Sequence, residues 1–477
     1  MRTNVARGSL LGIAGQGWHL LTAFLLYAIL ARRLGPAAFG QWRVVISVLV
    51  WFELFINSGL IKVATKSISE ARADRSRIER ASYLGQGIIA AAAFIALEVL
   101  APPIAALLGR PELAPLLRVS ALDIPLYGAF MVASAIVLGD ERYERQAVAW
   151  IIYATAKFVA IAVLVLAGFS LTGALVGNAL SSIVGFAVVF APWKKREGSE
   201  ADVAALARVL MIAAVPFLAL SVTEGLGQSA DLWLVSAIVP SATAVGLYAS
   251  ATVLAEVPTF LFLGLQRVIF PSVARAAAEC DDKLAGHYAM QGVRLAIIVC
   301  VFIVAIAAST GHQLLALVYS DAYAGAFVPL VLLMVAASGR TIRATCGEVL
   351  MARDRRRAAL AVMAGVLVLE IALLAALAPR YGLVGAAAGV AAAALVGGLW
   401  SVALIGRQIG TRPLATLVRC AVSAALVGAG LVLFTPAAPL WLAAAYPLAA
   451  IAYAALLWVT REIGAPDVAS LRRAFGR

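Results

Sequence analysis

The chain has 477 residues, of which 63% are hydrophobic and only 13% are charged, and its mean hydropathy is +0.97. This composition excludes a water-soluble fold of this length and predicts a polytopic membrane protein. The net charge of +13 comes from Lys and Arg residues in short loops between apolar stretches. We therefore expect these charges to contact anionic lipids, and we expect no nucleic-acid partner.

Apolar stretches long enough to cross a bilayer follow one another along the whole chain. A bilayer core needs about 20 apolar residues per helix, so the fold class predicted is all-α, with about 14 transmembrane helices. The predicted spans are 8–31, 38–61, 81–108, 114–138, 147–168, 171–192, 205–237, 242–270, 291–310, 324–351, 358–378, 383–406, 414–434 and 439–460. The first contains Gln16 and His19 and is too long for a signal core, so we expect it to be retained as a helix.

Two stretches, Val137 to Gly185 and Val349 to Gly397, are copies of one another. They align without a gap, each reading as a basic loop, an apolar helix, a short Gly-containing turn and a second apolar helix. The strongest evidence is the shared LxGA turn and the alignment of Gly177 with Gly389. Such an internal repeat predicts a duplicated membrane protein with two pseudo-symmetric lobes.

The repeat and the basic residues together predict the domain organisation and the topology. The predicted parts are an N-terminal lobe at 1–200 with spans 1–6, a C-terminal lobe at 201–410 with spans 7–12, and 411–477 with spans 13–14 and a tail. Most of the 38 Lys and Arg residues fall on the side of the N-terminus. Because cytoplasmic loops carry the excess of basic residues, we expect both termini to be cytoplasmic. The exceptions are Arg32, Arg33, Arg43, Arg110, Arg118, Arg380 and the mid-span Lys157.

A weaker repeat links the turn after span 1 with the turn after span 7. Both offer Pro followed by Gly-x-aromatic, in LGPAAFGQW (34–42) and in VPSATAVGLY (239–248). With these turns, the sequence resembles the multidrug/oligosaccharidyl-lipid/polysaccharide (MOP) exporter superfamily, in its Wzx-like polysaccharide transporter branch. The resemblance rests on ARRLGPAAFGQW (31–42), VGLYASA (245–251) and VIFPSVAR (268–275), and it extends over nearly the whole chain.

The resemblance implies two six-helix lobes around a central cavity. It also implies a flippase that moves undecaprenyl-diphosphate-linked oligosaccharide from the cytoplasmic to the periplasmic leaflet of a bacterial inner membrane, for surface polysaccharide synthesis. Spans 13 and 14 look like those of lipid II flippases, where they form a lipid-facing groove. We expect a functional monomer, working near a polymerase of the same pathway.

Cationic residues in or beside the spans are the candidates for binding the substrate diphosphate. Lys157 lies mid-span, where a charge costs at least about 2.5 kcal/mol and needs a partner or a role. A flexible ammonium binds phosphate as a point charge. The alternative is a structural pair with a carboxylate such as Glu53 or Glu98. Further cavity candidates are Arg43, Arg267, Arg294, Arg343 and His19.

Acidic residues inside the spans are the candidates for ion coupling. Glu370 stands next to Leu369, the repeat equivalent of Lys157, so the two lobes carry opposite charges at one depth. Glu370, Asp231, Glu224 and Glu53 could hold Na⁺ or exchange protons. Pairing with Arg or a helix-capping role is the alternative for each of these acids.

Other functions are less well supported by the sequence. No loop is long enough to hold a separate catalytic domain, so we expect a transporter with no catalytic residue, and not a polysaccharide polymerase or ligase. The four Cys residues are isolated, and we expect no metal site and no cofactor. A drug or cation antiporter of the same superfamily would favour an acidic and aromatic cavity, which Lys157 argues against.

Overall fold

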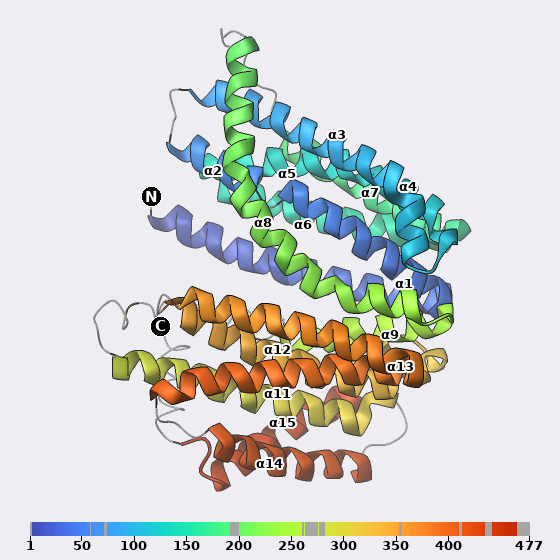
Figure 1. Ribbon diagram of the computed structural model, residues 1–477, viewed down its shortest axis with the longest axis vertical. Coiled ribbons are helices and arrows are strands. Elements are labelled where there is room, and N and C mark those ends of the chain that lie inside the picture. The colour runs from blue at the N-terminus through green and yellow to red at the C-terminus, as the bar shows by residue number, and fades with distance from the viewer. Residues whose placement is uncertain are drawn as a thin grey trace. The chain divides into compact units, whose positions relative to one another are not determined.

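The computed structural model describes residues 2–57, 59–70, 74–190, 200–259, 262, 275, 282–352, 355–409, 413–434 and 441–464. In these ranges all regular structure is helical and no β-strand occurs (Figure 1), which confirms the predicted fold class. Nine helical stretches of the described chain are long and apolar enough to cross a membrane. Several of them contain two predicted spans, and the total of fourteen stays a prediction.

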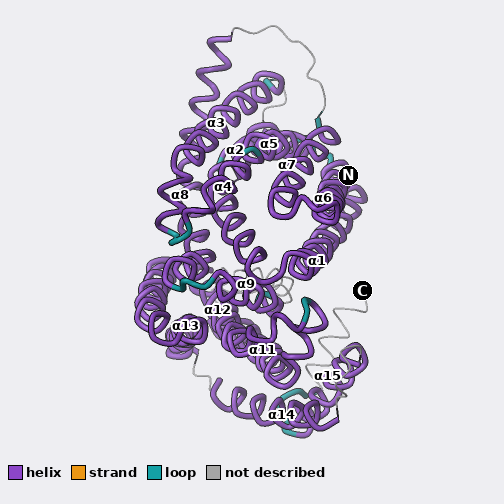
Figure 2. Tube along the Cα trace, turned by 90° about the vertical axis from the view of Figure 1, so that its right-hand side faces the viewer, coloured by secondary structure: helices purple, strands orange, loops and turns teal. Residues whose placement is uncertain are grey.

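The chain divides into two compact units, Met1–Gly246 and Leu247–Arg477. Within each unit the helices run side by side, as Figure 2 shows nearly end-on. The helices of unit 1 are α1 (Arg2–Asn57), α2 (Leu60–Glu70), α3 (Arg75–Leu107), α4 (Ala114–Ala121), α5 (Asp123–Gly139), α6 (Tyr143–Leu164), α7 (Ser170–Val189) and α8 (Glu200–Ile238). Helix α9 (Ala242–Ala255) contains the boundary, and α11 (Asp282–Val318), α12 (Phe327–Ala352), α13 (Arg356–Ile409), α14 (Pro413–Phe434) and α15 (Leu442–Val459) belong to unit 2.

Two of the long helices each join a pair of predicted spans through a single non-helical residue. In α1 this residue is Gly35, with φ of 74° and ψ of 172°, and Pro36 follows it. In α13 it is Gly382, with φ of 57° and ψ of −134°. Glycine reaches a positive φ at no steric cost, so the chain reverses there without a longer loop.

The backbone supports the repeat seen in the sequence. Ser170, the residue aligned with Gly382, has φ of 50° and ψ of −134°, which is the same unusual conformation. The aligned glycines also have equivalent neighbours: a Cβ at Gly177 would lie 2.8 Å from the backbone nitrogen of Ile161, and one at Gly389 would lie 3.0 Å from the carbonyl carbon of Leu373. Ile161 and Leu373 are themselves aligned, so both helical hairpins pack through the same close contact.

Helix α8 packs on unit 1, although the repeat assigns it to the second lobe. Leu60 and Ala81 share a buried cluster with Ala207 and Leu210 of α8. The two units are defined by which helices pack together, whereas the predicted lobes are defined by the sequence repeat. The lobe boundary between residues 200 and 201 therefore stays a prediction.

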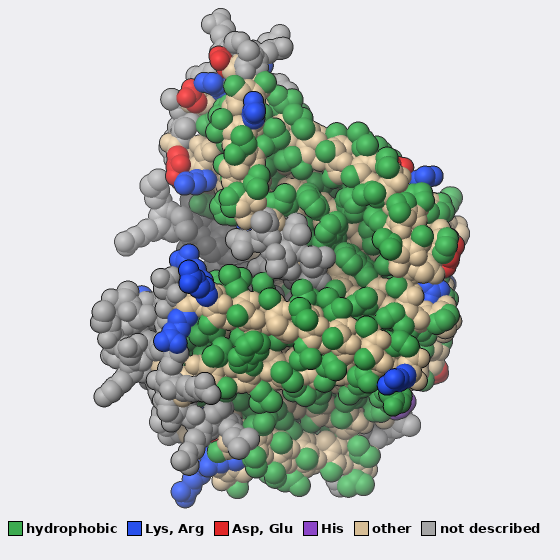
Figure 3. Space-filling view, viewed as in Figure 1, with side chains coloured by type: hydrophobic (Ala, Val, Ile, Leu, Met, Phe, Trp, Pro, Cys, Tyr) green, Lys and Arg blue, Asp and Glu red, His purple; other side chains and the backbone are tan. Residues whose placement is uncertain are grey.

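The outward faces of the helices are apolar. Val99, Val368 and Leu433 are among many large hydrophobic side chains that are exposed. Figure 3 shows hydrophobic side chains covering the helices on the visible face, with Lys and Arg mainly near helix ends. Such a surface suits contact with lipid chains, with basic residues at headgroup depth.

Candidate functional site

Unit 1 buries a polar cluster that is organised around Asp123. This aspartate is 1% exposed and is the first residue of α5, where the helix dipole favours a negative charge. Asn178 Nδ2 donates a hydrogen bond to its Oδ2 at 2.5 Å, and Ser182 Oγ donates one to its Oδ1 at 2.6 Å. Asn178 and Ser182 stand one turn apart on α7, so both reach the same carboxylate.

A second carboxyl group completes the cluster. Glu53, from the half of α1 that follows Gly35, lies within hydrogen-bond reach of Asp123 and within electrostatic reach of Lys157. Two carboxylates this close repel one another unless a proton or a cation offsets their charge. The cluster therefore needs a positive partner, and α6 supplies one.

Lys157 of α6 is a cation whose charge acts on both carboxyl groups of this cluster. Its Nζ lies 5.8 Å from the centroid of the Tyr153 ring, a cation–π contact. The ammonium is also within electrostatic reach of Asp123, Glu53 and His19. It makes no hydrogen bond or ion pair with any residue that the structure describes.

The two carboxylates predicted as alternative partners of Lys157 lie in different surroundings in the structure. Glu53 joins the cluster, whereas Glu98 lies 3.8 Å from Arg118 in an ion pair of its own. His19 packs edge-on against Trp150 with ring centroids 6.3 Å apart. Its Nδ1 is buried without a hydrogen-bond partner within the described part of the chain. His19 is also within electrostatic reach of Lys157, and its role in lining a cavity stays a prediction.

Arg43 has different neighbours. Its guanidinium lies 5.3 Å from the Tyr27 ring centroid, and Nη1 donates to the Tyr27 hydroxyl at 3.5 Å. Both residues belong to α1, one on each side of Gly35. The contacts of Arg43 thus connect the two halves of α1, and none of the contacts described for it reaches the Asp123 cluster.

In unit 2 the structure brings together two residues that the sequence analysis gave separate roles. Arg343 of α12 lies within electrostatic reach of Glu370 of α13, which is only 8% exposed. The neighbouring Arg340 pairs with Glu256 at 3.5 Å. An arginine near Glu370, here Arg343, is the alternative that the sequence left open for this acid.

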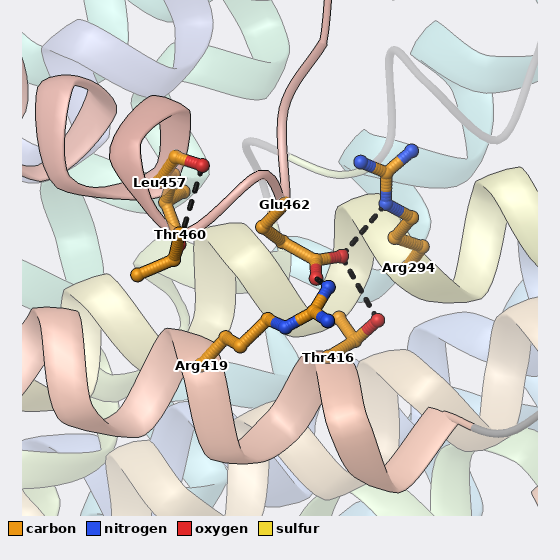
Figure 4. A network of polar contacts seen from close by, with 6 residues as sticks. All are labelled: Arg294, Thr416, Arg419, Leu457, Thr460 and Glu462. Carbon is orange, nitrogen blue, oxygen red and sulfur yellow. Dashed lines mark hydrogen bonds and ion pairs between the residues drawn. The ribbon is translucent and has the colours of Figure 1, made fainter.

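Arg294 belongs to a polar network at the end of α15, shown in Figure 4. Glu462, 4% exposed, accepts hydrogen bonds at Oε1 from Arg294 Nε at 2.8 Å and from Thr416 Oγ1 at 2.9 Å. Its Oε2 accepts from Arg419 Nη1 at 3.1 Å. Burial raises the pKa of Glu462, but the hydrogen bonds from Arg294, Thr416 and Arg419 outweigh burial and hold the pKa below its ordinary value. We call these four residues the Glu462 clamp.

The remaining predicted residues lie elsewhere. Asp231 Oδ1 accepts a hydrogen bond from the backbone N–H of Leu232 at 2.7 Å. Arg267 and the side chain of Glu224 lie outside the described residues. No group of three or more His, Cys, Asp or Glu side chains that could hold a metal ion occurs among the residues described.

Unit 2 also contains an apolar cavity of about 180 Å³. Four helices line it, with Cys300 from α11, Ser338 from α12, Leu395 from α13 and Leu417 from α14. Its walls suit a hydrocarbon chain better than a charged headgroup.

The residues that organise both polar networks, Asp123 and Glu462, were not among those predicted from the sequence. Asp123 falls inside the predicted span 114–138, and the rule applied to Lys157, that a charge in a span needs a partner or a role, would have selected it. Glu462 carried no such signal, because it follows the last predicted span. Only the packing of α11, α14 and α15 brings its three donors together.

Comparison with known proteins relates this arrangement to transporters. Residues 5–277 match the family described as polysaccharide biosynthesis protein. The succinoglycan biosynthesis transport protein ExoT of Rhizobium meliloti (strain 1021) is 29% identical over 183 residues, which are 37% of this chain and 36% of ExoT. The match thus spans about a third of that relative's length.

Solved structures show the same fold at low sequence identity. The lipid II flippase MurJ, in an inward closed conformation, matches with a TM-score of 0.77 and 12% identity, over 95% of this chain and 99% of MurJ. An inward-facing multidrug resistance MATE transporter of the MOP superfamily matches with a TM-score of 0.69 and 14% identity, over 83% of this chain and 98% of that chain. These matches show the fold. The polysaccharide branch predicted from the sequence is borne out by the family match over residues 5–277. The names of the relatives also agree with the prediction of a transporter and not an enzyme.

Proposed function

Because the chain belongs to the family of polysaccharide biosynthesis proteins, we propose that it is a flippase for undecaprenyl-diphosphate-linked oligosaccharide. It moves these units from the cytoplasmic to the periplasmic leaflet of a bacterial inner membrane by alternating access, with both termini in the cytoplasm. The exported units serve the synthesis of O-antigen, capsule or exopolysaccharide. The transport role in the printed name of ExoT supports this substrate class.

The observation that carries the proposal is an ammonium inside the apolar helices of unit 1. A diphosphate must cross a hydrocarbon core that opposes any charge, and a cation along its route lowers that barrier. Lys157 suits this role because its Nζ is held by no described hydrogen bond and its stem is flexible. His19, which is within electrostatic reach of it, is a second lining residue.

Other charged residues take supporting roles in the proposal. Arg43, Arg343 and Arg267 are additional positions for the diphosphate or for sugar hydroxyls along the route. The guanidinium of Arg294 is engaged by Glu462, so we assign it to the attachment of α14 and α15. The apolar cavity of unit 2 is a place for part of the polyprenyl chain.

Ion coupling is a separate element of the proposal. Glu53, Glu370, Asp231 and Glu224 are the acids through which Na⁺ or protons would drive transport. Flipping in proteoliposomes, measured with either gradient imposed and then collapsed, identifies the coupling ion. Equal rates under every gradient would exclude coupling through these residues.

The substrate role of Lys157 is tested by complementation. In a strain that lacks the gene, Lys157→Ala at normal expression should reduce surface polysaccharide to about the level of the empty vector. Glu98→Gln, which removes an acid paired with Arg118, is the matched control and should restore export. Full export with Lys157→Ala would refute the assignment of this residue.

A drug or cation antiporter is the second candidate function, favoured by the MATE fold match. Efflux of ethidium from cells tests it. Lys157→Ala would leave or increase the efflux of a cation, because the substitution removes a like charge, whereas it stops the export of an anion. A polysaccharide polymerase or ligase would instead show product formation in a purified system.

A further inference from the structure

The last turn of α8 is attached to the rest of unit 1 by two buried hydrogen bonds. Arg110, only 6% exposed, donates from Nη2 to the backbone carbonyl of Val239 at 3.0 Å. Ser236, 2% exposed, donates from Oγ to the carbonyl of Leu108 at 3.1 Å. Carbonyl groups at a helix C-terminus have no partner inside the helix, and the helix dipole favours a cation beside them. Arg110 therefore caps α8 from a separate segment of the chain.

The segment that caps α8 is the tight turn between α3 and the short helix η1 (Pro111–Leu113). Gly109 has φ of 67° in this turn, and a Cβ on it would lie 3.1 Å from the carbonyl oxygen of Ala237. Any other residue here would strain the backbone and press on α8. The amide of Arg110 donates to the carbonyl of Ala105 at 2.8 Å, so the turn is itself fixed to the end of α3. Figure 1 shows this connection and the end of α8 at the same end of unit 1.

A third contact joins the end of α8 to α1. Trp233 stands one turn before Ser236, and its Nε1 donates to the Oγ of Ser47 at 2.9 Å. Its ring meets the ring of Trp51 edge-on, with centroids 6.1 Å apart. Trp233, Ser236 and Val239 come at every third position, which keeps them on one side of α8. We call the contacts of these three residues with Ser47, Trp51, Leu108 and Arg110 the α8 latch.

The α8 latch fixes the part of the chain that leads from one unit to the other. The boundary between the units, at Gly246, follows Val239 closely in the chain, and the internal repeat assigns α8 to the second lobe. A movement between the lobes is therefore transmitted through the end of α8. Earlier in α8, Ala207 and Leu210 attach the helix to unit 1 by apolar contacts, which are non-directional. The hydrogen bonds of the latch are directional and are either made or broken.

We propose that the α8 latch is a periplasmic gate, which is closed in this structure and opens once in each transport cycle. This inference rests on the proposed function, whose topology places the end of α8 on the periplasmic side. When the gate opens, the guanidinium of Arg110 and the carbonyl of Val239 exchange each other for water. Such an exchange changes the net free energy only modestly, so the open and closed states stay close enough in free energy to alternate.

The direct test cross-links the two sides of the latch. Leu108→Cys and Ser236→Cys are combined in a full-length chain whose four native Cys residues are replaced by Ser, and a short thiol cross-linker that a reductant cleaves joins the pair. Flipping of the lipid-linked oligosaccharide in proteoliposomes should fall to the level of protein-free vesicles and return after reduction. Each single-Cys variant, treated in the same way, should flip throughout. Flipping at the full rate by fully cross-linked protein would overturn the proposal.

Thiol labelling tests the latch without measuring transport. Ser236→Cys alone, in the same background, is treated in intact spheroplasts with a membrane-impermeant methanethiosulfonate, which reaches only the periplasmic side. Adding Arg110→Gln should raise the labelling rate about tenfold, as expected for the loss of one hydrogen bond from a charged donor. Arg110→Lys should keep part of the protection, because an ammonium can donate to the same carbonyl. Arg118→Gln, which removes an arginine that pairs with Glu98, is the matched control and should leave the rate unchanged.

The outcomes separate the latch from the proposed function. Equal labelling rates with and without Arg110→Gln would overturn the latch, whatever the substrate is. If the wild type does not flip the oligosaccharide while Arg110→Gln raises labelling, the proposed function fails and the gate stands. If Arg110→Gln does not reach the membrane, Trp233→Phe takes its place, because it removes the bond to Ser47. Labelling should then rise about threefold, and an unchanged rate would contradict the latch.

Discussion

Removing the charge of Glu462 should loosen the last two helices from α11. Glu462 accepts three charge-assisted hydrogen bonds, at 2.8, 2.9 and 3.1 Å. Glu462→Gln keeps the shape of the side chain, but its single amide oxygen accepts without a charge and its NH2 group cannot accept at all. Hydrogen bonds to charged groups contribute about 1.5–3 kcal/mol each in buried sites. Arg419 is half exposed, so solvent screens its share. We expect a total loss of about 2 kcal/mol, which is about thirtyfold in the local opening equilibrium.

Hydrogen–deuterium exchange measures this opening directly. The amide of Glu462 donates to the carbonyl of Leu457 at 2.8 Å, so its exchange reports the end of α15. Peptides covering residues 457–464 should exchange about thirtyfold faster in Glu462→Gln, because exchange through local opening follows the opening equilibrium. Thr460→Ala, which removes a hydroxyl that donates to the carbonyl of Leu457 and leaves the three bonds to the Glu462 carboxylate in place, is the control. Equal exchange in Glu462→Gln and the wild type would refute the clamp as an attachment point.

The remaining predictions concern the backbone and pH. Ser170→Gly should raise the free energy of unfolding by about 0.5–1 kcal/mol, and Gly382→Ser should lower it, because both positions hold the same positive-φ conformation. Melting temperatures measured in detergent should shift in opposite directions for the two variants. Gly246→Ala should yield aggregated protein by size-exclusion chromatography, because its Cβ would collide with the carbonyl oxygen of Pro36, while Gly87→Ala, with open space around it, should remain monodisperse. The protection of residues 457–464 should fall as pH decreases through the lowered pKa of Glu462, because a depressed carboxyl pKa stabilises only while the group is ionised; Glu462→Gln should show no such pH dependence.

The sequence predicted the fold class because hydropathy and the internal repeat are properties of single helices and their connections. The alignment of Ser170 with Gly382 even matches a backbone conformation that no propensity rule gives. The packing of α8 on unit 1 could not be predicted in this way. It depends on which apolar faces meet, and α8 is apolar along most of its length.

The candidate site was only partly predictable for a related reason. Lys157 stands out as a single charge in an apolar stretch, so the sequence identifies it. Its surroundings depend on Asp123 and Asn178, which come from α5 and α7. Such a grouping arises from tertiary packing and leaves no pattern along the chain. The same holds for Arg294, which sequence reasoning assigned to the diphosphate and which the structure pairs with Glu462.

We propose that the ammonium of Lys157 lowers the barrier that an anionic lipid headgroup meets inside the bilayer. The direct measurement is flipping of a fluorescent undecaprenyl-diphosphate oligosaccharide in proteoliposomes, with the wild type, Lys157→Ala and Glu98→Gln reconstituted at equal density. The account predicts rapid flipping with the wild type and Glu98→Gln, and flipping with Lys157→Ala close to that of protein-free vesicles. Equal rates for the wild type and Lys157→Ala, or no flipping by the wild type, would contradict it.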